Sequence, residues 1–149
     1  MPMIKIFQDK YLIKCADIFF DVYKNEPFNY FWLEYNSIVD YFADMLKTPK
    51  FKGFVFLKKN VIVGCCFGVV SDYFKIKKYR IAEIFVDRNF QSKGIGTNML
   101  MEIQKYFVLN GVDVIEITTD KNSKAFEFYK KNEYAVLQNN INMVKLLKH

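Results

Sequence analysis

The stretch that decides the fold runs from Ile81 to Phe107 and reads IAEIFVDRNFQSKGIGTNMLMEIQKYF. Its first six residues are apolar with β-branched and aromatic members, which predicts a buried strand over Ile81–Val86. From Ile95 the apolar residues recur at the spacing of one helical face, which predicts a helix. The turn between them, Gln91–Thr97, directs free backbone N–H groups and the positive end of the helix to one point. The turn therefore suits a phosphate group.

The spacing of the glycines in this turn excludes two better-known phosphate loops. A dinucleotide loop needs a third glycine three residues after Gly96, and that position is Met99. A Walker-type loop needs Gly-Lys-Ser/Thr after a four-residue spacer, and the sequence has no such run. The remaining pattern is Gln-x-x-Gly-x-Gly after a strand ending in Phe-Val. In it Gly94 and Gly96 let a ligand approach the backbone, and Lys93 adds a positive charge.

Length and composition predict one folded domain over residues 1–149. The chain has 52% hydrophobic and 18% aromatic residues, enough for a single core and too many for a disordered protein. No apolar run approaches the roughly 18 residues of a membrane span. Residues 1–5 lack the form of a signal peptide. We therefore expect a cytoplasmic protein without a membrane partner.

Cysteine and histidine usage narrows the possible chemistry. The cysteines are Cys15, Cys65 and Cys66, with no Cys-x-x-Cys pair, so neither a disulfide framework nor a metal site is expected. The single histidine is His149. Any acid–base catalysis must therefore use Glu, Asp, Tyr, Lys or Cys.

The net charge of +6 is unevenly distributed. Residues 1–49 carry five lysines and seven acidic residues, whereas residues 50–149 carry 17 basic and nine acidic ones. A basic second half permits a nucleic-acid module, but the lysines are scattered and no nucleic-acid-binding motif is present. The same charge suits a small polyanion, so we expect no nucleic-acid partner.

Hydrophobic periodicity predicts the remaining elements. Gly64 and Gly68 inside one predicted strand indicate a bulge or the close approach of another backbone. A hairpin turn is expected at 58–60, a loop dense in aromatics at Asn25–Trp32, and a polar connection at Asp72–Lys78. The further strands are expected at Met3–Phe7, Phe51–Leu57, Val61–Val70, Val112–Thr119, Tyr134–Leu137 and Ile141–Leu147, and the further helices at Asp9–Lys24, Leu33–Lys47 and from a cap at Asp120 or Asn122 through Lys131.

A second motif lies in the last predicted helix, which reads NSKAFEFYKK from Asn122. Asn122, Ala125 and Tyr129 stand at i, i+3 and i+7, and we expect them on one helical face. The strand before this helix should run parallel to the central strand, because the helix after the phosphate turn forms a crossover between them. Both helices should then begin at the same sheet edge, where the Tyr129 hydroxyl can reach the crevice between the strands.

These two motifs, in this order, resemble the GNAT superfamily of N-acetyltransferases, and the resemblance covers nearly the whole chain. It implies an α/β fold with a mixed, mostly antiparallel central sheet, a parallel central pair and helices on both faces. The chain departs from the family pattern at Ser92–Lys93 and at Arg88. It also departs at Glu133, which replaces a helix-ending glycine, so we expect that cap to be strained or reshaped.

The resemblance also implies acetyl-CoA as the acyl donor, without a metal. The backbone of Phe85 and Val86 is then expected to hold the pantetheine arm as an added strand. Asn122, with Ala125 on the same helical face, is expected beside that arm, and Tyr129 beside the thioester sulfur. The pyrophosphate is expected on the N–H groups of Gln91, Ser92, Lys93, Gly94, Ile95, Gly96 and Thr97.

The reaction implied is direct transfer of the acetyl group to a primary amine. Tyr129 is the expected proton donor to the leaving thiolate. Glu83 is the expected base, because it interrupts an apolar strand and burial raises the pKa of a carboxyl group. The alternatives are that Tyr129 is a core aromatic and that Glu83 faces solvent or pairs with Arg80. A Cys65 or Cys66 nucleophile is a lesser option, since no histidine is available to activate it.

The acceptor is expected to be a small cationic amine. Candidate contacts are Glu26, Phe28, Trp32 and Tyr73, because carboxylates and aromatic faces attract cations. The aromatic loop and the run Thr48-Pro49-x-Phe51-x-Gly53 are loosely similar to aminoglycoside 6′-N-acetyltransferase-like members. Acetylation of a protein or peptide amine, and acetyl-CoA binding without turnover, remain alternatives. A homodimer through the C-terminal strands is possible.

Overall fold

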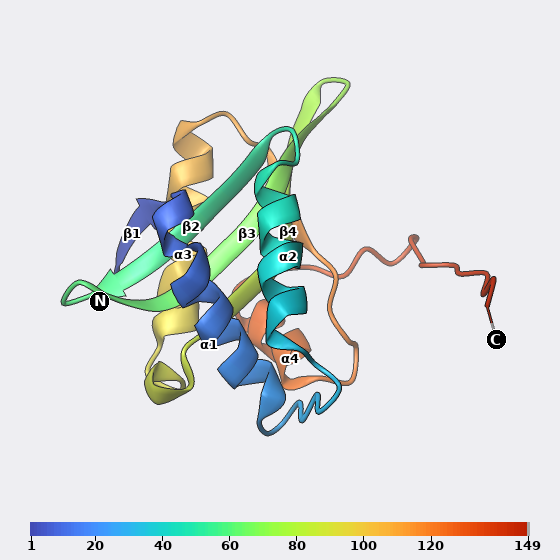
Figure 1. Ribbon diagram of the computed structural model, residues 1–149. Coiled ribbons are helices and arrows are strands. Elements are labelled where there is room, and N and C mark those ends of the chain that lie inside the picture. Colours follow the sequence, from blue (N-terminus) through green and yellow to red (C-terminus); the bar gives the residue numbers. More distant parts are fainter. Residues whose placement is uncertain (149) are drawn as a thin grey trace. The chain divides into compact units, whose positions relative to one another are not determined.

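The computed structural model describes residues 1–148, and backbone contacts divide the chain into two compact units, Met1–Thr118 and a second unit beginning at Thr119. The first unit carries most of the regular structure (Figure 1). Its elements are β1 (Met3–Ile6), the 3-10 turn η1 (Asp9–Tyr11), α1 (Leu12–Lys24), α2 (Tyr35–Leu46), β2 (Phe51–Lys58), β3 (Val61–Tyr73), β4 (Ile76–Val86), the 3-10 turn η2 (Arg88–Phe90), α3 (Ile95–Leu109) and β5 (Val114–Ile117).

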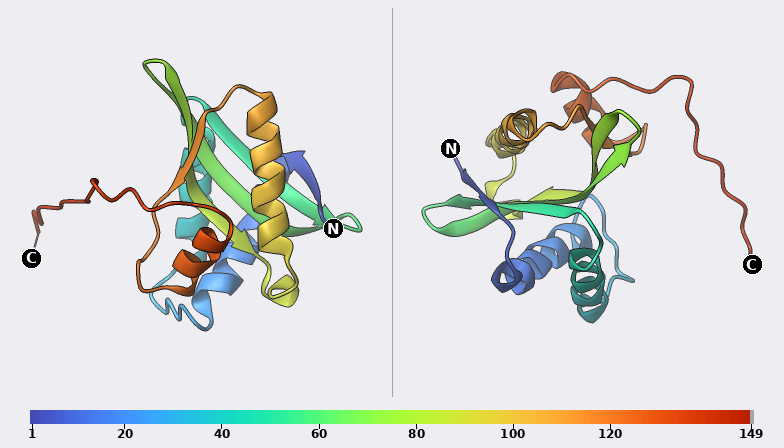
Figure 2. Two further views of the ribbon diagram at one scale, coloured as in Figure 1. Left: turned by 180° about the vertical axis from the view of Figure 1, so that it is seen from behind. Right: turned by 90° about the horizontal axis from the view of Figure 1, so that it is seen from above.

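The strands form one sheet in the order β1-β2-β3-β4-β5. The first four pair antiparallel, and β4 pairs parallel to β5 because α3 crosses between them. Helices α1 and α2 cover one face of the sheet and α3 covers the other (Figure 2). This confirms the predicted class, a mixed and mostly antiparallel sheet with one parallel pair and helices on both faces.

Strand alternation divides the core of this unit into two layers. On the α1/α2 face, Phe67 of β3 and Phe85 of β4 pack against the ring of Phe42 from α2. On the α3 face, Phe54 of β2 and Tyr79 of β4 pack against Phe107 of α3. All six side chains are buried. Because aromatic pairs prefer edge-to-face and offset contacts, these rings fix the spacing of the layers.

The sequence prediction is correct for one of the two hairpins of the sheet and wrong for the other. The turn at 58–60 is confirmed, since Lys59 and Asn60 both have positive φ, as a two-residue hairpin turn requires. The expected polar connection at Asp72–Lys78 is wrong, because Ser71–Tyr73 pair in register with Ile76–Lys78 as the tip of the β3–β4 hairpin. Asp72 forms ion pairs with Lys50 and Lys77 there, so opposite charges on neighbouring strands support the extension.

In the part of the second unit that the structure describes there is one helix, α4 (Lys124–Lys131). It begins after Ser123, whose hydroxyl accepts a hydrogen bond from the N–H of Phe126 at 3.2 Å, so the predicted cap at Asp120 or Asn122 is corrected. At its end Glu133 has φ +68°, while the N–H groups of Glu133 and Tyr134 donate to the carbonyls of Lys130 and Tyr129. This is a Schellman cap with glutamate at the position where helices favour glycine.

The predicted strands Tyr134–Leu137 and Ile141–Leu147 do not form. Ile141, Val144 and Leu147 are 80–86% exposed. Alternation and β-branching indicate that a segment can pair as a strand, but a strand also needs a partner ladder. Within residues 1–148 these segments pair with no strand. The described helices include none with both the length and the apolar character to cross a membrane.

Candidate active site

A β-bulge turns Glu83 toward the helices α1 and α2. Phe67 pairs with Glu83 and the next residue, Gly68, pairs with Ile81, so Ala82 is the extra residue on β4. Tyr79 and Ile81 face α3, and strict alternation would send Glu83 to the same side. The extra residue reverses the alternation, and Glu83 lies on the face of Phe85. The strand glycines predicted a bulge or the close approach of another backbone, and Gly68 shows both, since it lies at the bulge and a Cβ atom there would lie 2.4 Å from the Arg80 carbonyl oxygen.

Glu83 is partly buried, and the loss of solvent raises the pKa of its carboxyl group to about 7. Tyr23 of α1 and Tyr41 of α2 lie near enough to feel its charge. Burial raises the pKa of both phenols, that of Tyr41 to about 12, and the negative charge of Glu83 raises them further. Arg80 pairs instead with Glu116 of β5. Glu83 is therefore a carboxyl group that changes protonation near neutral pH, in the neighbourhood of two tyrosines.

The parallel pairing of β4 and β5 stops short of the end of β4. Lys78–Ile81 pair with Val114–Ile117, and β5 then ends. From Glu83 to Val86, β4 pairs with β3 on one side only within the described residues. The other side of this segment is an open strand edge, and its backbone N–H and C=O groups can pair with an extended ligand. The edge includes Phe85 and Val86, the residues predicted to hold the pantetheine arm.

The turn that follows has the backbone expected of an anion site. Ser92 and Gly94 have φ of +61° and +78°, and Gly94 is the residue before α3. In the described chain no side chain caps the start of α3, so the N–H groups of its first turn are free for a ligand. The Gln91 side chain donates to the Val86 carbonyl at 3.0 Å and joins the turn to β4. One buried acceptor of this first turn, Asn98 Oδ1, has no partner among residues 1–148.

The second unit places its three predicted residues in two settings. Asn122 precedes α4, in a turn where its N–H donates to the Asp120 carboxylate at 2.8 Å. The predicted helical face is therefore corrected, because only Ala125 and Tyr129 lie within the helix. Tyr129 is buried, with its ring 5.3 Å from Phe128 and 5.6 Å from Tyr134.

The loop after α1 presents the aromatic rings predicted for the acceptor. The ring of Tyr30 is stacked between Tyr23 at 5.9 Å and Trp32 at 5.2 Å, and Phe28 packs at the side of this stack. Trp32 is 73% exposed and Phe28 is 41% exposed, so these rings are surface groups and not core. Glu26 is also exposed. The stack therefore leads from Tyr23, beside Glu83, to solvent.

Lys24 holds this loop in place. Its ammonium group donates to the carbonyls of Phe31 and Leu33, both at 2.9 Å. The N–H of Tyr30 donates to the Tyr23 carbonyl at 2.9 Å. Sequence reasoning did not identify Lys24, Tyr23 or Tyr41, because lysine at a helix end and tyrosine on an amphipathic helix are ordinary residues there.

Tyr73 is not brought together with Glu83. It lies at the tip of the β3–β4 hairpin, opposite Ile76, with Lys78 over its ring at 5.6 Å. Glu83 pairs with Phe67, six residues back along β3, which corresponds to roughly 20 Å.

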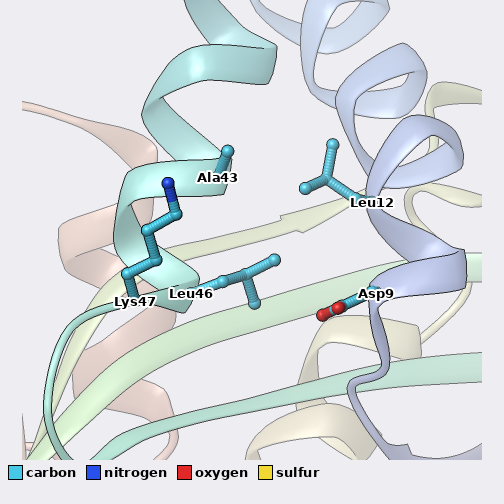
Figure 3. Close-up of a pocket in the computed structure, with 5 residues that line it drawn as sticks. All are labelled: Asp9, Leu12, Ala43, Leu46 and Lys47. Atoms are coloured by element: carbon cyan, nitrogen blue, oxygen red, sulfur yellow. The ribbon is translucent and has the colours of Figure 1, made fainter.

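Two surface hollows of the first unit are lined by none of these residues. One, of about 320 Å³, is lined by residues of η1 and the start of α1 and by the end of α2 (Figure 3). Leu12, at that end of α1, is about 16 Å along the helix from Tyr23. The other hollow lies along the last turns of α3. The described residues contain no cluster of histidine, cysteine and carboxylate side chains that could hold a metal ion.

In a comparison with known proteins, residues 16–134 of this chain match the family model that is described as "Acetyltransferase (GNAT) family". An uncharacterized N-acetyltransferase of Methanocaldococcus jannaschii is 33% identical over 87 residues, which are 56% of this chain and 38% of that protein. The chain thus spans well under half the length of that relative.

Solved structures share the fold at lower identity. An aminoglycoside acetyltransferase from an uncultured soil metagenomic sample, in complex with sisomicin, has a TM-score of 0.75 and 20% identity, with 99% of this chain and 97% of that chain covered. AAC(6′)-Iy, in complex with the bisubstrate analogue CoA-S-monomethyl-acetylneamine, has a TM-score of 0.72 and 13% identity over 98% and 99% of the two chains. At these identities the likeness is one of fold.

Proposed function

The chain belongs to the acetyltransferase (GNAT) family, and from this premise we propose that it transfers an acetyl group from acetyl-CoA directly to a primary amine of a small cationic molecule. The proposal rests mainly on the position and the environment of Glu83. A carboxyl group with a pKa near 7 lies at a bulge, on a strand whose open edge continues into an uncapped helix N-terminus. Glu83 can therefore act as a base beside a strand edge and a helix N-terminus that can together bind an extended polyanionic ligand.

The cofactor is proposed to follow β4 and the turn. The open edge at Phe85 and Val86 suits the amides of the pantetheine arm, because an extended chain can add to a strand edge. The N–H groups from Gln91 to Thr97 are proposed to hold the pyrophosphate. Those of the first turn of α3, which follows Gly94, suit it best, because no side chain of the described residues caps them. The N–H of Gln91 donates to the Arg88 carbonyl at 3.4 Å and would have to exchange that partner for the ligand. By the family resemblance, Asn122 and Ala125 are proposed to contact the arm.

The chemistry is proposed to use two side chains. Glu83, as carboxylate, accepts a proton from the ammonium group of the acceptor, and the neutral amine then attacks the thioester carbonyl carbon. A C–N bond forms, the C–S bond breaks, and Tyr129 is proposed to donate a proton to the departing thiolate. A carboxyl group with its pKa near 7 suits this exchange, because it is half ionised at neutral pH.

The acceptor is proposed to lie along the aromatic loop. Tyr23 and Tyr41 both lie near enough to Glu83 to feel its charge, and the stack of Tyr30 and Trp32 continues from Tyr23 to the surface. Aromatic faces attract cations with about 0.5–1 kcal/mol per exposed contact. Glu26 adds a negative charge to the same loop, so a molecule with more than one amino group is favoured over a neutral one.

The deciding experiment measures thiol release from acetyl-CoA with a panel of acceptors. The panel contains polyamines and amino sugars, amines with one charge, neutral amines, and peptides with a free N-terminus or lysine. We expect the highest kcat/KM for small polycations and a fall in kcat/KM as salt rises. Peptides as the best acceptors would replace the small molecule by a protein substrate. Binding of acetyl-CoA with no acceptor-dependent thiol release would refute the catalytic proposal.

A further inference from the structure

The three cysteines of the chain are not equivalent, because strand alternation separates the adjacent pair. Cys65 and Cys66 are neighbours in β3 and are both fully buried. Cys66 faces α3, where its sulfur lies 3.6 Å from the hydroxyl of Tyr79. Cys65 points to the opposite face and meets Cys15 of α1, which is also fully buried. One thiol of the neighbouring pair therefore has a sulfur partner and the other does not.

The Cys15 and Cys65 sulfurs are 2.8 Å apart. Carbon atoms in ordinary contact are about 3.5–4.0 Å apart, and sulfur is the larger atom. The two thiols are thus closer than a packing contact, although they are 50 residues apart in the chain and lie on different elements. A disulfide needs only a further approach to about 2.05 Å. The packing of α1 on β3 already supplies most of that proximity.

We propose that Cys15 and Cys65 are a dithiol–disulfide modification site, which a peroxide oxidises to a bond between α1 and β3. The thiolate of one cysteine attacks a peroxide oxygen, the O–O bond breaks, and a sulfenic acid forms with release of water. The second thiol displaces the hydroxyl group as a second water, and the S–S bond forms. Two thiols and one hydrogen peroxide thus give one disulfide and two waters. The site is separate from the proposed acetyl transfer, which uses neither cysteine.

Burial sets the rate of this modification. Desolvation raises the pKa of the Cys65 thiol well above its ordinary value, so the reactive thiolate is scarce at neutral pH. The peroxide must also reach the thiols through local opening of α1 against the sheet. We therefore expect slow oxidation of the folded protein. The disulfide, once formed, restrains the unfolded chain and raises the melting temperature, by roughly 5 °C or more.

The experiment treats the folded protein with hydrogen peroxide at neutral pH. The time course is long enough to oxidise completely the thiols of a guanidinium-unfolded sample. Remaining thiols are alkylated under denaturing conditions before intact mass and non-reducing peptide mapping. We expect loss of two hydrogens, one cross-linked peptide pair containing Cys15 and Cys65, and alkylated Cys66. Melting of the oxidised protein should return to the lower temperature after dithiothreitol.

Three alanine variants complete the test. Cys66→Ala removes an equally buried thiol on the same strand and should form the cross-link at the unchanged rate. Cys15→Ala and Cys65→Ala should lose the cross-link and the reversible rise in melting temperature. A cross-link to Cys66 in the folded protein, sulfinic acid without a disulfide, or unchanged mass over the full time course would overturn the proposal. The result with Cys66→Ala decides the matter even where the other two variants fold poorly.

Discussion

The turn Gln91–Thr97 and the loop Asn25–Trp32 are both exposed connections of the first unit, yet they are built in opposite ways. In the turn, the useful groups are backbone N–H groups, and their direction depends on the positive φ of Ser92 and Gly94. In the loop, the useful groups are aromatic rings, and the backbone is tied down by the Lys24 side chain. The turn should therefore tolerate altered side chains but not an altered φ. The loop should respond to the loss of a ring.

Glu83 connects the two regions, and its replacement should have the largest effect. It lies on the strand that leads to the turn, with its side chain beside Tyr23 at the base of the loop. Glu83→Gln keeps the shape and removes the base, so we expect kcat/KM to fall roughly 10²- to 10⁴-fold. Glu102→Gln on α3, a partly exposed carboxyl group, should leave kcat/KM unchanged.

The pH dependence gives a second measure of Glu83. The base is the ionised form, so kcat/KM of the wild-type protein should rise with pH and reach half its plateau near pH 7. Glu83→Gln should lose this inflection. An inflection near pH 7 that persists in the variant would assign it to another group.

The role of the turn Gln91–Thr97 in binding acetyl-CoA is tested by comparing Gly94 with Gly111, because both glycines have a positive φ. Gly94 and Gly111 have φ of +78° and +74°, and an added Cβ would meet nothing closer than 3.8 Å at Gly94 and nothing within 4 Å at Gly111. Both alanine variants therefore carry similar backbone strain. Only Gly94→Ala should weaken acetyl-CoA binding, by about tenfold. Calorimetry with equal affinities for the two variants would show that the turn does not hold the cofactor.

The role of the loop Asn25–Trp32 in binding the acceptor is tested by comparing two of its aromatic residues that are about equally exposed to solvent. Trp32 is 73% exposed and stacks on Tyr30, whereas Phe31 is 74% exposed and has no aromatic partner within residues 1–148. Trp32→Ala should raise KM for a cationic acceptor roughly 2- to 5-fold, the value of one exposed cation–π contact. Its affinity for acetyl-CoA should not change. An equal rise in KM for Phe31→Ala would mean that stacking does not define the acceptor surface.

The smallest effect is expected at Glu133, where the backbone constraint of the turn recurs with a residue other than glycine. Its φ of +68° strains any side chain that carries a Cβ atom. Glu133→Gly should relieve that strain, at some cost in the entropy of the unfolded chain, and stabilise the protein by about 0.5–1 kcal/mol without a change in kcat. Asn132→Gly is the matched control, because Asn132 has φ −95° and gains nothing from glycine. Thermal melting in which both variants lose stability would contradict this assignment.

The sequence by itself determined those features of the fold that depend on local patterns of residues. Within residues 1–148, periodicity identified the four helices and the five strands of the sheet in order, because one buried face fixes each spacing. The Gln-x-x-Gly-x-Gly spacing identified the turn before α3, since only a residue free to adopt positive φ fits at Gly94. The same reasoning predicted two C-terminal strands that do not form, because a pattern of alternation cannot supply a pairing partner.

Only the tertiary structure decided the features that depend on contacts between distant residues. The bulge that turns Glu83 toward α1 arises from the register of β3 on β4, and register is a property of the pair and not of either strand. The burial that raises the pKa of Glu83 comes from helices about 40 to 60 residues earlier in the chain. The contact of Cys15 with Cys65, 50 residues apart in the chain, likewise exists only because folding packs α1 against β3.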